Sequence, residues 1–185
     1  MTSAPIIEVR DAIYGDADAM CDAQVAGWRA AYRGLFPDSY LDSDDFDASR
    51  RAWWLGGSWL DTAVTHTFAG LVDSQVLGFS VVGPERFDDA PAVPGQGEVY
   101  SFYLQPQVWG SGLARDLMDA SERWLRERGL TELSLWVLRD NPRARSFYEK
   151  SGWAWSGAES LWAGPTMPGI LRPDPVAEVR YARTL

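Results

Sequence analysis

Residues 107–113 have the sequence QVWGSGL, and they connect a predicted strand, residues 98–104, to a predicted helix, residues 111–128. The first turn of a helix leaves backbone N–H groups without partners, and the helix dipole adds partial positive charge there. Because Gly110 and Gly112 have no side chains, a phosphate can approach those N–H groups closely. The stretch therefore predicts an anion site at a strand-to-helix turn, although an ordinary glycine turn would have the same sequence.

Two other phosphate-binding patterns fit this turn less well. The dinucleotide fingerprint needs a third glycine and an acidic residue near the end of the next strand, whereas Ala114 and Arg115 follow here. The P-loop needs a Gly-Lys-Ser/Thr sequence, which this chain lacks. The turn by itself leaves the identity of the anion open.

A second segment, residues 141–153 with the sequence NPRARSFYEKSGW, predicts a short helix further along the chain. Asn141 can cap this helix, and Pro142 suits its first position. We expect the helix to present Tyr148 close to the anion site.

The whole chain predicts one mixed α/β domain over residues 1–185, long enough to bury a sizeable core. The predicted strands span residues 6–10, 65–71, 76–82, 98–104, 132–138, 153–156 and 176–183. The predicted helices span residues 16–32, a segment from near 39 to 56, residues 111–128 and a segment that begins at 142. Residues 85–96 and 157–175 are predicted to be loops.

The order of these elements predicts how the sheet is built. The strands at residues 65–71 and 76–82 are joined by a short turn, so they should form an antiparallel hairpin. The strand–helix–strand unit over residues 98–138 should be parallel and right-handed. We therefore expect a mixed sheet with helices on both faces.

The composition is that of an ordinary soluble globular protein, with 46% apolar and 23% charged residues. The formal net charge is -9, from 17 basic and 26 acidic residues. This balance argues against nucleic acid as a partner, because phosphate binding needs a positive field. The charge could steer a cationic small molecule toward the protein, or it could serve only to keep the protein soluble.

Single copies of cysteine and histidine limit the chemistry further. Cys21 is the one cysteine, so an internal disulfide is excluded and no cysteine cluster indicates a metal. His66 is the one histidine, and we expect a structural role for it within a strand. The sequence shows no charged segment followed by an apolar one, as in a signal peptide, and no apolar run long enough to cross a bilayer. We therefore expect a cytoplasmic protein with no membrane partner.

With both segments considered, the chain resembles the Gcn5-related N-acetyltransferase (GNAT) family, as a small bacterial-type member. Residues 107–112 match the family's Gln/Arg-x-x-Gly-x-Gly/Ala acetyl-CoA motif. Residues 27–35 and 178–183 also resemble segments common in small bacterial members. The family's helix motif near the C-terminus is matched by Asn141, Ala144, Phe147, Tyr148 and Gly152.

The resemblance covers nearly the whole chain. It implies a mostly antiparallel twisted sheet of about seven strands, with about four helices on both faces. It also implies acetyl-CoA as co-substrate, without a metal. Family members are often homodimers, but no segment here specifies an interface.

The family's cofactor contacts can be assigned to matching positions. The backbone of Phe102, Tyr103 and Leu104 should pair with the pantetheine arm like an added strand. Asn141 should contact the same arm, and Tyr148 should lie near the sulfur. The turn residues expected around the pyrophosphate, mainly through their amides, are Gln107, Val108, Trp109, Gly110, Ser111, Gly112 and Leu113.

The turn departs from the family pattern at two positions. Trp109 stands where a cationic residue is common, and Ser111 often has a basic counterpart in the family. Fewer charges near the phosphates could weaken coenzyme A binding. Arg115, Arg143 or Arg145 could compensate, because a guanidinium suits a phosphate; alternatively, these arginines belong to a solvated helix face.

Acetyl transfer to an amine needs a proton removed and a proton supplied. An alkyl amine is mostly protonated at neutral pH, so it must lose a proton before it attacks. Glu98, which opens the strand expected to hold the thioester, is our candidate base, directly or through water. Tyr148 is our candidate general acid for the departing thiolate. Alternatively, Glu98 is a carboxylate at the rim of the site without a catalytic role, and Tyr148 is a tyrosine of the core.

The acceptor side of the site is less well specified by the sequence. Trp28 and Tyr32 lie one turn apart on the first predicted helix, and they could border an acceptor pocket together with Trp53 and Trp54. Core packing is the competing explanation for all four rings.

The sequence therefore favours an acetyl-CoA-dependent N-acetyltransferase that acts by direct transfer in a ternary complex. The expected acceptor is a primary amine of a small molecule or peptide. Two alternatives remain: transfer to a hydroxyl or from a longer acyl-CoA, and a non-catalytic sensor of acyl-CoA.

Overall fold

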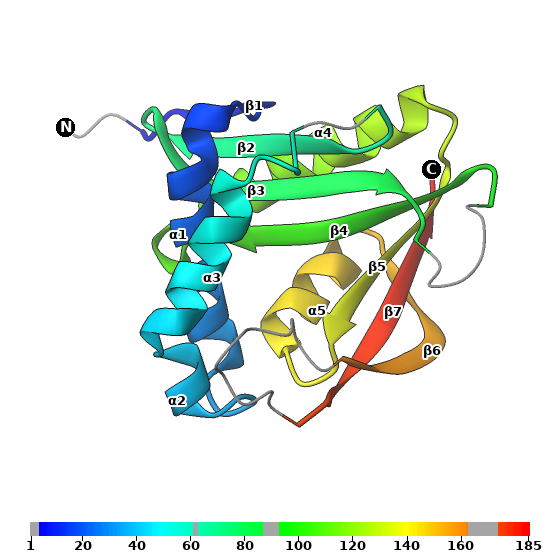
Figure 1. The fold of residues 1–185 in the computed structure, drawn as a ribbon. Helices are drawn as coiled ribbons and strands as arrows, with labels where there is room; N and C mark the ends of the chain where they lie inside the picture. The colour runs from blue at the N-terminus through cyan, green and yellow to red at the C-terminus, as the bar shows by residue number, and fades with distance from the viewer. Residues whose placement is uncertain (1–3, 61–62, 87–92, 163–173) are drawn as a thin grey trace.

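The computed structural model describes residues 4–60, 63–86, 93–162 and 174–185. A seven-stranded sheet lies at its centre, with the strand order β1-β2-β3-β4-β5-β7-β6 (Figure 1). The β4–β5 pair is parallel and the other neighbouring pairs are antiparallel. The strands are β1 (Ile7–Asp11), β2 (His66–Val72), β3 (Gln75–Pro84), β4 (Gln96–Leu104), β5 (Glu132–Leu138), β6 (Ala154–Trp162) and β7 (Val176–Thr184). The predicted mixed, mostly antiparallel sheet is confirmed.

Five α-helices are described, where about four were expected. They are α1 (Ala17–Tyr32), α2 (Asp38–Leu41), α3 (Asp44–Leu55), α4 (Leu113–Glu127) and α5 (Pro142–Lys150), with short 3-10 turns at Tyr14–Asp16 and Pro106–Val108. The additional helix arises because the segment predicted as one helix from near Ser39 is two. Ser43 interrupts it, since its backbone is extended and its Oγ accepts a hydrogen bond from the Phe46 N–H at 3.1 Å.

Helices cover both faces of the sheet, as predicted. α1 packs on β3 and β4 and against α3, whereas α4 packs on β1, β2 and β3 (Figure 1). The α1 face has a core that includes Met20, Trp54 and Phe79. The opposite core includes Leu117 of α4 and Tyr148 of α5. The sheet is thus a rigid support between two buried layers.

The central feature for the site is the separation of β4 from β5. Their register runs only from Gln96 opposite Glu132 to Val99 opposite Leu135. Beyond this point β4 continues to pair with β3, and β5 continues to pair with β7, but the two strands diverge (Figure 1). Backbone groups on the facing edges, residues 100–104 and 136–138, have no neighbouring strand and can bind another extended group.

Two predicted connections have different outcomes. The β2–β3 hairpin has its short turn at Asp73 and Ser74, whose φ values of 49° and 67° are positive; this agrees with a tight hairpin turn. The predicted short strand at residues 153–156 is wrong in length, because β6 continues to Trp162 along β7. Residues 157–162 are therefore strand rather than loop. The remaining predicted loop residues 163–173, like 87–92, lie outside the described part.

Candidate active site

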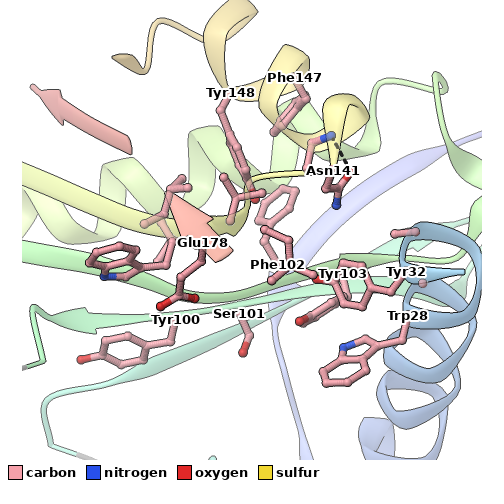
Figure 2. Close-up of a pocket in the computed structure, with 18 of the residues that line it drawn as sticks. Trp28, Tyr32, Tyr100, Ser101, Phe102, Tyr103, Asn141, Phe147, Tyr148 and Glu178 are labelled. Carbon is pink, nitrogen blue, oxygen red and sulfur yellow. Dashed lines mark hydrogen bonds between the residues drawn. The ribbon is translucent and has the colours of Figure 1, made fainter. Parts of the chain in front are cut away.

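A cavity of about 960 Å³ lies where β4 and β5 separate. Residues from α1, α3, β4, β5, α5, β6 and β7 line it, so segments distant in sequence meet around it (Figure 2). The predicted site residues that line it are Trp28, Tyr32, Glu98, Phe102, Tyr103, Leu104, Trp109, Gly110, Asn141 and Tyr148. The cavity therefore brings together the residues predicted for cofactor, acceptor and proton transfer.

The glycine turn has the geometry of an anion site. Gly110 and Gly112 have φ values of 82° and 106°, a region that glycine adopts at little cost. Gly112 directly precedes α4. Among the described residues, the N–H groups of Gly110, Gly112 and Ala114 have no backbone acceptor. Unpaired N–H groups at a helix N-terminus are suited to a phosphate.

The other residues of the turn have their side chains directed elsewhere. Val108 and Leu113 are buried in the core on the α4 face. Gln107 and Ser111 are exposed, and the Ser111 Oγ accepts a hydrogen bond from the Leu113 N–H at 3.3 Å. Any contact of these four residues with a ligand must therefore involve their backbone or exposed side chains outside the cavity.

Trp109 is accompanied by a cation from another element. Its indole N–H donates to the Leu104 carbonyl at 3.3 Å, and the Arg143 guanidinium lies 4.3 Å from its ring centroid. This stacking holds a positive charge from α5 beside the turn. Arg145, in contrast, donates to the Tyr181 hydroxyl and the Arg139 carbonyl. Of the three arginines considered, Arg143 lines the cavity.

Asn141 begins α5 as predicted. Its Oδ1 accepts a hydrogen bond from the Ala144 N–H at 3.2 Å, and Pro142 follows at the first helical position (Figure 2). Because the oxygen is used for the cap, the side-chain NH2 is left as the donor at the cavity wall. The cap therefore fixes both the start of α5 and the orientation of this amide.

Tyr148 extends from α5 into the cavity (Figure 2). Its ring is 7% exposed and contacts Phe102, Phe147 and Tyr181. Burial raises the pKa of the phenol well above its ordinary value, and the neighbouring Tyr103 adds to this. A phenol with a raised pKa is protonated at neutral pH, so it can donate a proton to a leaving group.

Glu98 lines the cavity but is paired with a cation. Its side chain is 5% exposed, and Arg86 donates to it from the backbone N–H at 2.9 Å, from Nε at 3.2 Å and from Nη2 at 2.6 Å. Both carboxylate oxygens are thereby occupied. No sequence pattern indicated this pairing, which is formed between residues at the end of β3 and the start of β4.

A second carboxylate, Glu178 of β7, lies across the cavity from β4 (Figure 2). It is half-buried and sits opposite Leu138 of β5 and Ser160 of β6. Burial raises the pKa of Glu178, the negative charge of Glu98 raises it further, and Arg86 opposes the shift. A carboxylate with a raised pKa is a stronger base than an ordinary one.

Aromatic rings form the wall of the cavity next to α1. Trp28 contacts Tyr32, Tyr103 and Trp162, with ring centroids 5.3, 6.4 and 5.4 Å away. Trp162, at the end of β6, also lies 5.8 Å from Phe36. Burial raises the pKa of both Tyr32 and Tyr103, so these phenols are neutral at physiological pH.

The expectation that Trp53 and Trp54 border the pocket is wrong. Trp54 is 1% exposed and packs in the core, where its indole N–H donates to Gln24 Oε1 at 2.9 Å. Trp53 is 45% exposed and lies on the surface. The residue of α3 that lines the cavity is Arg50, which lies one helical turn before Trp54.

The lining residues that sequence reasoning did not assign to the site include Arg50, Arg86, Trp162 and Glu178. One of them had a usable signal. Val179 and Tyr181 of β7 are buried in the core, and side chains alternate along a strand, so Glu178 had to point to the other side. The other three depend on pairings between distant segments, which a single sequence does not display.

His66 has the structural role that we expected. It interacts with Asp11 at 2.9 Å and stacks on Trp124. In the part of the chain that the structure describes, no cluster of three or more potential metal ligands occurs. None of the described helices has the length and apolarity needed to cross a membrane.

Comparisons with known proteins agree with this architecture. An uncharacterized N-acetyltransferase of Bacillus subtilis, YuaI, is 25% identical over 142 residues, which are 74% of this chain and 75% of that protein. A spermidine N(1)-acetyltransferase of Thermoplasma acidophilum is 24% identical over 79% of this chain and 87% of its own length. A mycothiol acetyltransferase of Rhodococcus jostii is 36% identical over 71% of this chain, which spans 41% of that longer protein.

Solved structures share the fold. The PaiA N-acetyltransferase of Thermoplasma acidophilum, determined in complex with coenzyme A, superposes with a TM-score of 0.71. The two sequences are 17% identical, and the match covers 97% of this chain and 99% of the other. A Gcn5-related N-acetyltransferase of Kribbella flavida gives a TM-score of 0.67 at 19% identity, with 97% and 98% covered.

The family model described as the acetyltransferase (GNAT) family matches residues 25–153, which include the glycine turn and α5. Because this match covers more than half of the chain, and because named acetyltransferases are among its relatives, the chain belongs to the GNAT family of acyltransferases.

Proposed function

We propose that this chain transfers an acetyl group from acetyl-CoA directly to a primary amine of a small molecule or peptide. The observation that supports this most strongly is the convergence on one cavity of three groups: the unpaired edge of β4, the glycine turn and Tyr148. The relatives named for spermidine and mycothiol favour a small-molecule acceptor.

Coenzyme A would lie in the opening between β4 and β5. Its pantetheine arm would pair with the free edge of β4 at Phe102, Tyr103 and Leu104. The amides of the turn, Val108 to Leu113, would hold the pyrophosphate. Arg143, fixed on Trp109, supplies the positive charge that the turn itself lacks. The Asn141 side-chain NH2 would donate to the arm.

The transfer step needs no oxidant or reductant. The neutral amine nitrogen forms a bond to the thioester carbonyl carbon, and the carbon–sulfur bond breaks. The departing thiolate takes the proton of the Tyr148 phenol, whose raised pKa keeps it protonated until that moment. The amine nitrogen carries one proton too many after the attack, and it releases that proton to the Tyr148 phenolate, directly or through water, so that the amide is neutral and the phenol is restored. A free backbone N–H on the edge of β4 would stabilise the oxyanion that forms on the carbonyl oxygen.

The base is assigned to the carboxylates of Glu98 and Glu178. The incoming ammonium must lose one proton, and both side chains line the cavity. Because Arg86 already donates to both oxygens of Glu98, Glu98 would act mainly by raising the pKa of its neighbour. Glu178 then accepts the proton directly or through water. If Glu98 is instead the acceptor of the proton, the pH profiles described below separate the two.

The direct test is a panel of amines assayed with acetyl-CoA, with free thiol and acetylated product measured in parallel. We expect equal amounts of thiol and N-acetyl product with at least one amine. Product on a hydroxyl, or turnover of longer acyl-CoA in preference to acetyl-CoA, would support the first alternative. Tight coenzyme A binding without thiol release from any acceptor would support a sensor and reject the proposal.

A further inference from the structure

Arg50 is a half-buried cation without a counter-ion among the described residues. Its Nε is enclosed and has no hydrogen-bond partner, and its guanidinium forms no ion pair with the described residues. The titratable groups around it are the phenols of Tyr40 and Tyr103 and the Cys21 thiol, which are neutral groups. Burial lowers the pKa of Arg50, but an arginine stays charged in proteins. A half-buried, unpaired charge is costly unless a ligand neutralises it.

Gln24 adds a second donor at the same part of the wall. It is 8% exposed and lines the cavity together with Arg50. The indole N–H of Trp54 can only donate, so it fixes Oε1 of Gln24 as the acceptor at 2.9 Å. The side-chain NH2 of Gln24 is therefore the remaining polar group, and it has no described acceptor. Two side-chain donors, one of them charged, therefore face this region, and among the described residues that line the cavity here no carboxylate accompanies them.

This region lies on the acceptor side rather than the coenzyme A side. Gln24 is on α1 and Arg50 on α3, whereas the glycine turn and Arg143 are on the opposite side of β4. Tyr32 and Tyr103 also line the cavity, next to Trp28 of α1 (Figure 2). Burial raises the pKa of Tyr32, and its neighbours Tyr103, Tyr148 and Glu178 raise it further.

We propose that Arg50 and Gln24 bind a carboxylate of the acceptor, so that the acceptor is an amine that also carries a carboxylate. Such a molecule places its amine at Glu178 and Tyr148 and its carboxylate at Arg50, with the phenols of Tyr32 and Tyr103 along its length. This inference rests on the proposed function and narrows its substrate class to amino acids and related amino-carboxylates.

The charges of the cavity favour this class over a polyamine. The described lining residues include Arg50, Arg86 and Arg143 as cations and Glu98 and Glu178 as anions. Arg86 neutralises Glu98, which leaves one carboxylate for one ammonium group. A second ammonium group on the acceptor would have to lie near the unpaired Arg50, where like charges repel.

The test compares matched acceptors that differ only in the carboxylate. One series is ω-amino acids of increasing length against the corresponding alkylamines, and another is α-amino acids against their amides. The ratio of kcat/KM within each pair is measured for the wild type, Arg50→Gln, Arg50→Lys and the control Arg123→Gln. Arg123 is an exposed arginine of α4 outside the cavity. Binding of each acceptor to the coenzyme A complex is measured by calorimetry.

We expect at least one pair to favour the carboxylate by about 10- to 100-fold in the wild type, the range for a hydrogen bond to a charged group. The preference should disappear in Arg50→Gln through KM, be partly kept in Arg50→Lys and be unchanged in Arg123→Gln. Acetylation without a carboxylate preference, or a preference that survives Arg50→Gln, overturns the inference and leaves the proposed function intact.

The binding data separate the remaining outcomes. Carboxylate-dependent binding that is lost in Arg50→Gln, without thiol release from any acceptor, supports the carboxylate site and rejects the proposed transfer. Neither binding nor thiol release with any acceptor rejects both.

Discussion

Tyr148 is the residue whose surroundings define its role most clearly. Its phenol faces the cavity, is buried among rings and has a raised pKa. We expect Tyr148→Phe to lower kcat by about 10²-fold or more, the usual contribution of a positioned acid. The affinity for coenzyme A should stay close to that of the wild type, because the ring and its packing remain. Unchanged turnover in a folded Tyr148→Phe variant would show that the phenol only fills the core.

The two carboxylates are distinguished by pH profiles. A base must be deprotonated to act, so kcat/KM should fall as the pH falls through the pKa of Glu178, which is raised from its ordinary value. Glu178→Gln should remove this acidic limb and lower the rate. Glu98→Gln removes a negative neighbour, so the limb should persist and move to lower pH. If Glu98→Gln abolishes the limb and Glu178→Gln only moves it, Glu98 is the base.

Arg143 is the residue that we propose compensates for the atypical turn in coenzyme A binding. Its guanidinium lies over the ring of Trp109, beside the amides of the turn. We expect Arg143→Gln to raise the Kd of coenzyme A about tenfold, or 1.4 kcal/mol, and to weaken the salt dependence of binding. Calorimetry at two salt concentrations measures both, with Arg123→Gln as the control. Equal affinities would place Arg143 on a solvated face with no part in binding.

The turn between β4 and α4 tests the anion site as a structural element. Gly110 has φ of 82° with no atom near its missing Cβ, and Gly129, at the other end of α4, has φ of 74° with the same free space. Alanine at either position should cost about 1–2 kcal/mol of unfolding free energy, because both force a left-handed residue. Only Gly110→Ala should also weaken coenzyme A binding, since its Cβ would approach the phosphate. Thermal unfolding and calorimetry on both variants make the comparison, and equal binding losses would contradict the assignment.

Elements whose signals are local could be predicted from the sequence. α5 has a capping Asn141 and Pro142 at its start, and β5 is rich in Leu and Val, so α5 begins and β5 runs where the sequence predicts. The full length of β6 could not be predicted, because Gly157 and the residues after it join the strand only through pairing with β7. The same limit applied to Arg86 and Glu98, which meet across the β3–β4 connection.

For the molecule as a whole, the sheet is the feature that makes a site out of dispersed segments. The parallel β4–β5 pair stays together only from Gln96 to Val99 on the β4 side. α1 and α3 then close one side of the opening, and α5, β6 and β7 close the other (Figure 1). The family resemblance predicted this architecture, and several residues that it assigned to the cofactor, among them Gly110 and Asn141, line the cavity. The acceptor side depends on the packing of Arg50, Trp162 and Glu178, for which no motif exists.

Transfer of a labelled acetyl group is the most direct test of the central claim. The protein is incubated with acetyl-CoA labelled in the acetyl carbonyl and with an amino-carboxylate, and the label is located after a single turnover. We predict that the label appears as an amide on the amine, in amounts equal to the thiol released, and that the protein carries none. Label recovered as free acetate, on the protein or still on coenzyme A would contradict direct N-acetyl transfer in this cavity.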